Sequence, residues 1–215
     1  ITLIFYRFMK YNSRFALKLT GLIVVIFILQ LIFPKITSLF ALNSSYVFSR
    51  PWTIITSIFL HGSFAHLLLN GFALALFGSI LEEIIGTKKF ISTFFLSGII
   101  AGITAAPFYN SALGASGAIY GILGILTVLR PGMTVWVSYL PLPMWAAAIF
   151  WALQDIFGIF IPSNIANFAH LGGLAAGLLI GFFLRKEKSP LKIKRKKDQL
   201  MLTKEELDEW ERKNI

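Results

Sequence analysis

The feature that most constrains this chain is an uncharged block of 40 residues between Lys89 and Arg130. As a helix this block would be roughly 60 Å long, about twice the thickness of the hydrocarbon core of a membrane. It therefore predicts two membrane crossings. The composition agrees, because 56% of the 215 residues are hydrophobic and 14% are charged, whereas about a quarter of the residues in soluble domains are charged. A soluble globular domain is not expected.

Hydropathy and turn-forming residues predict an all-α membrane protein with six spans. The fourth span is short, since its 14 residues cover about 21 Å as a helix. Between the first two spans, residues 36–60 are apolar and aromatic but are interrupted by Asn43, Arg50 and Pro51, which favours an interfacial loop with short helices on the outer surface. The expected spans are residues 16–33, 63–81, 89–106, 116–129, 142–158 and 165–184.

The basic residues are distributed asymmetrically about these spans. Eighteen Lys and Arg fall on the side that holds both termini, and two, Lys35 and Arg50, fall on the other. The positive-inside rule therefore predicts cytoplasmic termini in a multi-pass protein of the plasma membrane. The predicted units are a cytoplasmic segment (residues 1–15), a six-span domain (16–184) and a basic cytoplasmic tail (185–215), whose residues 185–197 are expected to contact anionic lipid.

Several other function classes are disfavoured by the sequence. The net charge of +10 is concentrated at the chain ends, so we expect no nucleic-acid partner. The chain has no cysteine, and its first two histidines, His61 and His66, are five residues apart, which is not the spacing of a helical zinc site. We expect neither a metal nor another cofactor.

Polar residues inside the spans cluster at one depth. Spans 2, 4 and 6 run in the same direction, and near their outer ends they carry His66 with Asn70, Ser116, and His170. A nucleophile, a base and two side-chain donors at one depth form the set that acyl transfer requires. The loop at residues 107–115 is expected to dip below the membrane surface, which requires that it be buried in protein or line a wet cavity. We expect water to reach Ser116.

Small residues explain how the helices that carry this set can approach. Glycines share a face with His170 on span 6 and lie beside Ser116 on span 4, and such stripes allow close backbone contact. These glycines are Gly117, Gly121 and Gly124 on span 4 and Gly177 and Gly181 on span 6.

Each polar residue also has a structural interpretation. Ser116 is in a position to be an ordinary helix N-cap. His170 is equally compatible with an interhelical hydrogen bond, and His66 and Asn70 with polar contacts between helices. These interpretations do not predict that the four residues converge at one depth.

Three segments together resemble the rhomboid family of intramembrane serine proteases. The first is His61-Gly-Ser-Phe-Ala-His66-Leu-Leu-Leu-Asn70, the second Gly114-Ala-Ser116-Gly117-Ala-Ile-Tyr120, and the third Ala169-His170-Leu-Gly-Gly173. Their order and spacing match the family over residues 16–184. Trp52 and, at the end of span 2, Gly78, Glu82 and Gly86 fit as well, while Thr53 stands where many relatives have Arg.

The resemblance implies a Ser-His dyad, with Ser116 as nucleophile and His170 as general base and then acid. It also implies that Tyr120 stacks on the imidazole, and that His66, Asn70 and the Ser116 backbone N–H form the oxyanion hole. Gly114, Gly117 and Gly173 belong to the matching motifs as supporting residues. A serine at a helix N-terminus suits these roles, since unpaired N–H groups lie beside it.

Two polar residues receive structural roles. Asp155 is the one acidic residue well inside a span and is a candidate to orient His170. Because the resemblance assigns a dyad, we expect Asp155 to act as a structural hydrogen-bonder instead. His61 matches a family position and is also expected to be structural.

The leading expectation is an endopeptidase that cuts single-span or polytopic membrane proteins in or near the outer part of a spanning helix. The scissile segment must unwind to reach Ser116, so small or helix-destabilising residues are expected there. The alternative is an inactive relative that binds membrane-protein clients. A small transporter or channel is disfavoured, because neither an internal repeat nor charges along a midplane path are evident.

Overall fold

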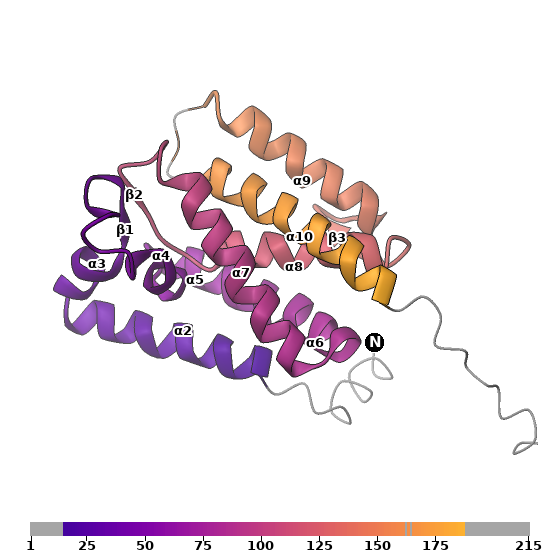
Figure 1. Cartoon of the computed structure of the whole chain (residues 1–215), viewed down its shortest axis with the longest axis horizontal. Helices are drawn as coiled ribbons and strands as arrows, with labels where there is room; N and C mark the ends of the chain where they lie inside the picture. The colour runs from indigo at the N-terminus through magenta and orange to yellow at the C-terminus, as the bar shows by residue number, and fades with distance from the viewer. Residues whose placement is uncertain (1–14, 162, 164, 188–215) are drawn as a thin grey trace, which may run out of the picture.

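The structure, a computed structural model, describes residues 15–161, 163 and 165–187. The predicted N-terminal segment and nearly all of the predicted tail, including the lipid-binding stretch and a short helix expected within residues 198–215, lie outside the described residues. The described chain is mainly helical (Figure 1).

Helices occupy all six segments predicted as spans. Four of these helices are long and apolar enough to cross a membrane, and the other two, α8 and α9, are shorter. The long ones are α2 (Phe15–Ile32), the continuous run of α5 (Phe64–Ala73), the π-helical turn η3 (Leu74–Gly78) and α6 (Ser79–Ile85), then α7 (Thr87–Ala105) and α10 (Asn167–Glu187). The shorter ones are α8 (Ser116–Leu129) and α9 (Met144–Gly158).

The connection between α2 and α5 contains short helices, as the sequence predicted. These are α3 (Lys35–Phe40), η1 (Ser44–Tyr46), α4 (Thr53–Thr56) and η2 (Ser57–Phe59). The same connection includes the short strand β1 (Leu42–Asn43), which pairs antiparallel with β2 (Ser111–Ala112) from the loop after α7. This pairing joins the first connection to the loop that leads into α8.

A β-hairpin separates α8 from α9. Its strands are β3 (Thr134–Val137) and β4 (Leu140–Pro143), and both residues of its turn, Ser138 and Tyr139, have positive φ. The fifth span was predicted to start at residue 142, but that residue pairs with Val135 in the hairpin and the helix begins at Met144. Positive φ values are uncommon outside glycine, so a turn made of serine and tyrosine is not expected from its residue types.

The central element of the fold is α8. In Figure 1 it lies behind α7 and α10, and it packs against both of them. Nine of its 14 residues are buried, including Ile122, Ile125 and Leu126. Large apolar side chains instead face outward on the surrounding helices, for example Leu31 on α2, Leu69 on α5 and Phe183 on α10. This distribution suits a helix bundle whose solvent is lipid.

The N-terminus of α2 is capped by a side chain from the second span. Glu82 is buried, and its carboxylate accepts hydrogen bonds from the backbone N–H groups of Phe15 and Ala16 at 2.9–3.3 Å. The hydroxyl of Thr87 also donates to it at 2.7 Å. A negative charge at a helix N-terminus satisfies unpaired donors and complements the helix dipole. Glu82 therefore joins α2 to the turn between α6 and α7.

Candidate active site

Ser116 is the first residue of α8, and the loop before it is fixed by backbone hydrogen bonds. The N–H of Gly114 donates to the carbonyl of Ser57 at 2.9 Å, and Ser111 and Ala112 pair with β1. Gly114 has a φ of 124°, and a Cβ there would lie 2.6 Å from the imidazole of His66. Glycine is thus required both by the backbone conformation and by the close approach of the ring.

The hydroxyl of Ser116 does not cap its own helix. The N-cap of α8 is Ala115, and no side chain caps the helix there. The Ser116 Oγ lies instead 2.9 Å from Nε2 of His170, on the first turns of α10. The structural interpretation of Ser116 as an ordinary N-cap therefore does not apply.

Tyr120, one turn after Ser116 on α8, stacks on the His170 imidazole. The two ring centroids are 4.3 Å apart and the planes differ by 11°. The histidine side chain is 13% exposed, so it is largely enclosed. Ser116 and Tyr120, which were grouped with His170 from the sequence, thus both contact its ring.

Glycines bring α8 and α10 close enough for this contact. A Cβ at Gly173 would overlap the carbonyl oxygen of Gly117, and one at Gly177 would overlap that of Gly121. A Cβ at Gly124 would lie 2.6 Å from the carbonyl oxygen of Leu174. The close approach predicted from the glycine stripes is present, and at these positions a larger residue would push the two helices apart.

The two predicted side-chain donors lie on α5 beside this pair. The His66 ring contacts Gly114, two residues before the serine, and it is close enough to His170 to interact with it electrostatically. The side-chain amide of Asn70, which is buried, donates to the backbone carbonyl of His66 at 2.8 Å. Among the described contacts, neither side chain hydrogen-bonds Ser116; His66 lies against the loop before the serine, and Asn70 is bound to the His66 backbone.

Asp155 contacts the opposite edge of the histidine. Its Oδ1 is 2.9 Å from Nδ1 of His170, and the residue is 3% exposed on α9. The sequence offered Asp155 as a candidate to orient His170, but the family resemblance favoured a structural hydrogen bond instead. The partner of Asp155 is the candidate base itself, so the site has three polar members in a row.

His61 lies behind His66 in the loop before α5. Its backbone N–H and carbonyl are both bound by the side-chain amide of Gln30 on α2, at 3.0 and 3.2 Å. The rings of His61 and His66 meet edge to face with centroids 5.0 Å apart. Gln30 had no predicted role, since in the sequence it is one polar residue within an apolar span. The structure shows that it is buried, with 7% exposure, and that it holds the His61 backbone.

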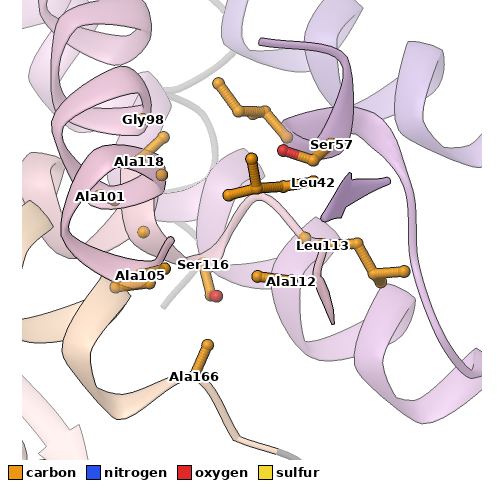
Figure 2. A pocket seen from close by; sticks show the side chains of 15 residues that line it. Leu42, Ser57, Gly98, Ala101, Ala105, Ala112, Leu113, Ser116, Ala118 and Ala166 are labelled. Carbon is orange, nitrogen blue, oxygen red and sulfur yellow. The ribbon is translucent and has the colours of Figure 1, made fainter. Parts of the chain in front are cut away.

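A small cavity of about 30 Å³ borders Ser116. Figure 2 shows the serine side chain with Ala105, Ala112 and Ala166 around it. Most of the other lining residues are also glycine or alanine, together with Leu42, Ser57, Ile58 and Leu113. A space of this size has room for one or two water molecules, and residues 112–114 of the loop contribute to its lining; that water occupies it stays a prediction.

A serine hydroxyl and an imidazole are thus in hydrogen-bonding contact inside a helical bundle. In the comparison with known proteins, residues 49–187 match the Rhomboid domain family. The match covers well over half of the chain, and the chain belongs to the rhomboid family. It is accordingly an integral membrane protein.

About one aligned residue in three is identical between this chain and its individual relatives. The chain is 34% identical over 140 residues to YdcA of Bacillus subtilis, which is named as a candidate rhomboid protease; the match covers 64% of this chain and 69% of YdcA. It is 32% identical over 157 residues to "Rhomboid protein 1, mitochondrial" of Saccharomyces cerevisiae, covering 67% of this chain and 45% of that protein. It is 31% identical over 138 residues to "RHOMBOID-like protein 6, mitochondrial" of Arabidopsis thaliana, a match that covers 63% of this chain and 44% of that protein. The chain thus spans less than half the length of the yeast and plant relatives.

Proposed function

We propose that this protein is an intramembrane serine endopeptidase, in which Ser116 is the nucleophile and His170 the general base and then acid. The observation that carries the proposal is the 2.9 Å contact between Ser116 Oγ and His170 Nε2 across two helices. A serine hydroxyl is a weak nucleophile unless a base is positioned to take its proton. Names of relatives that contain "protease" support the same activity.

The proposed reaction proceeds in two halves. Ser116 Oγ attacks the scissile carbonyl carbon while its proton passes to His170 Nε2. The tetrahedral intermediate then collapses, the C–N bond breaks, and the histidine returns the proton to the leaving amine. A water molecule next attacks the acyl-enzyme, giving its proton to His170, and the second collapse releases the new carboxyl end and restores the serine hydroxyl.

The oxyanion of each intermediate needs hydrogen-bond donors. We assign these to the backbone N–H of Ser116 and to the side chains of His66 and Asn70. The first-turn N–H groups of a helix have no intrahelical partner and carry the positive end of its dipole. The position of the His66 ring against Gly114 supports its inclusion, and Asn70 has a second amide hydrogen besides the one that it donates to the His66 carbonyl.

The proposed topology has six spans formed by α2, α5 to α6, α7, the short α8, α9 and α10. Both termini are then cytoplasmic in a plasma membrane, as the distribution of basic residues favours, and the basic tail contacts anionic lipid. Asn110 is exposed in the loop before α8 and lies on the outside in this topology. In cells that express Asn110→Cys, a thiol probe that cannot cross membranes should label the protein, whereas it should not label Lys204→Cys. The reverse labelling pattern would show that the protein has the opposite orientation in the membrane.

The proposed substrates are membrane-anchored proteins cut near the outer end of a spanning helix. A peptide bond inside a helix is hydrogen-bonded and shielded, so the segment must unwind to reach Ser116. The small cavity beside the serine is lined largely by glycine and alanine. A substrate with small or helix-destabilising residues at the cut suits both conditions.

An inactive, client-binding relative is the competing function. In that case neither a paired nucleophile nor a base is required. The presence of both, in hydrogen-bonding contact, favours the enzyme.

The deciding experiment reconstitutes the protein in liposomes with a single-span substrate. Wild-type protein should cut the substrate and react with a fluorophosphonate at Ser116, whereas Ser116→Ala should do neither. Ser92→Ala is the matched control, because Ser92 is an exposed helical serine on α7 that bonds only the Lys88 carbonyl among described groups; it should retain full cleavage. Full cleavage by Ser116→Ala would refute the proposed function.

A further inference from the structure

Both ring nitrogens of His170 are engaged, each by a residue from a different helix. Nε2 contacts Ser116 Oγ on α8 at 2.9 Å, and Nδ1 contacts Asp155 Oδ1 on α9 at the same distance. Tyr120 stacks on the face of the ring. The ring is thereby held at two edges and one face.

The chemistry of the carboxylate decides where the protons of this ring lie. A carboxylate only accepts hydrogen bonds, so Nδ1 must carry the hydrogen and Nε2 of the neutral ring is left as the acceptor. That tautomer is the one able to take the proton of Ser116. The opposite tautomer would place a hydrogen on Nε2 and leave the serine without a base.

We propose that Asp155 is a positioning residue, which fixes the tautomer and orientation of His170 and completes a Ser-His-Asp arrangement in this chain. The proposal rests on the proposed hydrolase function and replaces the two-member site that the family resemblance implies. Asp155 acts through the histidine and does not touch the reacting atoms.

The surroundings of Asp155 increase the effect. The residue is 3% exposed, and its second oxygen, Oδ2, is buried with no hydrogen-bond partner among the described residues. When the serine proton reaches His170, the imidazolium forms 2.9 Å from this buried carboxylate. Coulombic attraction is several times stronger in such a site than in bulk water, so the ion pair stabilises the transition state.

A purely structural role, in which Asp155 only ties α9 to α10, makes a different prediction for Asp155→Asn. Asparagine has the same shape and retains a hydrogen bond to Nδ1, so a structural tie would survive. However, its amide can either accept from Nδ1–H or donate to a bare Nδ1. Oδ2 has no hydrogen-bond partner among the described residues, and the Tyr120 hydroxyl that faces Asp155 can either donate or accept. The accepting orientation of the amide is therefore not fixed, and the unproductive tautomer becomes populated.

The first test compares wild type with Asp155→Asn in liposomes. We expect kcat for a single-span substrate and the rate of fluorophosphonate labelling to fall together by about 10²-fold or more, towards the loss of about 10⁴-fold seen when the acid of a triad becomes an amide. KM and the thermal midpoint should change little. Asn167→Ala is the matched control: Asn167 on α10 packs against Gly158 on α9, so the variant weakens the same pair of helices without touching the imidazole. It should keep kcat within about 10-fold of wild type.

The second test reads the tautomer directly by ¹⁵N NMR of protein labelled at histidine. The chain has three histidines, and the signals that disappear in His170→Gln are those of His170. Wild-type His170 should be protonated at Nδ1, and Asp155→Asn should show protonation at Nε2. Protonation at Nε2 in the wild type would overturn the proposal without any variant, as would an Asp155→Asn protein with kcat within about 3-fold of wild type.

The failure of the proposed function would look different. If the wild-type protein neither cuts substrate nor reacts with the fluorophosphonate, the hydrolase assignment fails. The NMR measurement on the same sample still decides whether Asp155 sets the tautomer of His170.

Discussion

The ring of Tyr120 lies parallel to that of His170, at an interplanar angle of 11° and a centroid distance of 4.3 Å. The two residues come from α8 and α10, and α8 also supplies Ser116. The stack therefore holds the imidazole from the same helix that carries the candidate nucleophile. Its strength depends on the ring and not on the hydroxyl.

Tyr120→Phe and Tyr120→Ala separate these two contributions. An aromatic pair contributes about 0.5–1.5 kcal/mol beyond its buried area, so loss of the ring in Tyr120→Ala should lower kcat about 3- to 10-fold. Tyr120→Phe keeps the ring and should stay within about 3-fold of wild type. Cleavage kinetics in liposomes check both values. Equal losses in the two variants would mean that the hydroxyl, which faces Asp155, matters more than the stack.

The packing of α8 against α10 predicts the effect of enlarging a glycine. In Gly177→Ala the new methyl group would overlap the carbonyl of Gly121, and overpacking of this kind costs about 1–3 kcal/mol. The thermal midpoint in micelles and the cleavage rate should both fall, because the two helices carry Ser116 and His170. Gly21→Ala on α2 is the matched control, since apart from the adjacent backbone of its own helix no atom of the described residues lies within 4 Å of the position that its methyl group would take. It should be as stable as wild type or more stable by up to about 1 kcal/mol. A Gly177→Ala protein as stable as Gly21→Ala would contradict the tight packing.

Much of the site could be predicted from sequence because few polar residues occur inside the spans. A polar side chain in lipid must face the bundle interior, so depth and helix direction already grouped Ser116, His170 and His66. The glycines on α8 and α10 then indicated which helices touch. In the structure Ser116 Oγ lies 2.9 Å from His170 Nε2, and the His66 ring lies against Gly114, two residues before the serine.

The sequence identified Asp155 as a candidate to orient His170, but it could not decide between that role and a structural hydrogen bond elsewhere. Asp155 and His170 are 15 residues apart on different helices, and α9 is apolar on nearly all sides, so the sequence does not fix its rotation about its own axis. The pairing of β1 with β2 and the hairpin of β3 with β4 were missed for a related reason. Their strands are only two to four residues long, too short for an alternating pattern.

His61 predicts a pH dependence of stability. Burial, together with repulsion from His66, lowers the pKa of His61 from 6.5 to about 4, and the nearby Phe59 backbone offsets only a small part of this shift. Between pH 6.5 and 4 the unfolded chain therefore binds a proton at His61 that the folded protein does not bind. Acidification through this window stabilises the unfolded state, by up to about 3 kcal/mol in total. Above pH 6.5 this contribution is constant.

His61→Phe isolates that contribution. Both ring nitrogens of His61 are buried without a hydrogen-bond partner among the described residues, so phenylalanine keeps the ring and leaves no polar group unpaired. Thermal midpoints measured in micelles from pH 7 to pH 4 should decline less steeply for His61→Phe than for wild type. Parallel curves for the two proteins would show that His61 is not the group that titrates.

Glu82 and Glu83 offer a matched pair of adjacent acids on α6 for the last prediction. Glu82 is 3% exposed and binds the backbone N–H groups at the start of α2 and the Thr87 hydroxyl through both of its oxygens, whereas Glu83 is exposed. Glutamine at position 82 retains one oxygen as an acceptor, but its NH₂ group replaces the other oxygen and faces groups that themselves donate hydrogen bonds. The substitution also removes the charge at the helix terminus. Glu82→Gln should therefore lower the free energy of unfolding by about 1–3 kcal/mol, while Glu83→Gln should stay within about 0.5 kcal/mol of wild type. Unfolding titrations in mixed micelles measure both differences, and similar midpoints for the two variants would show that the cap on α2 does not stabilise the fold.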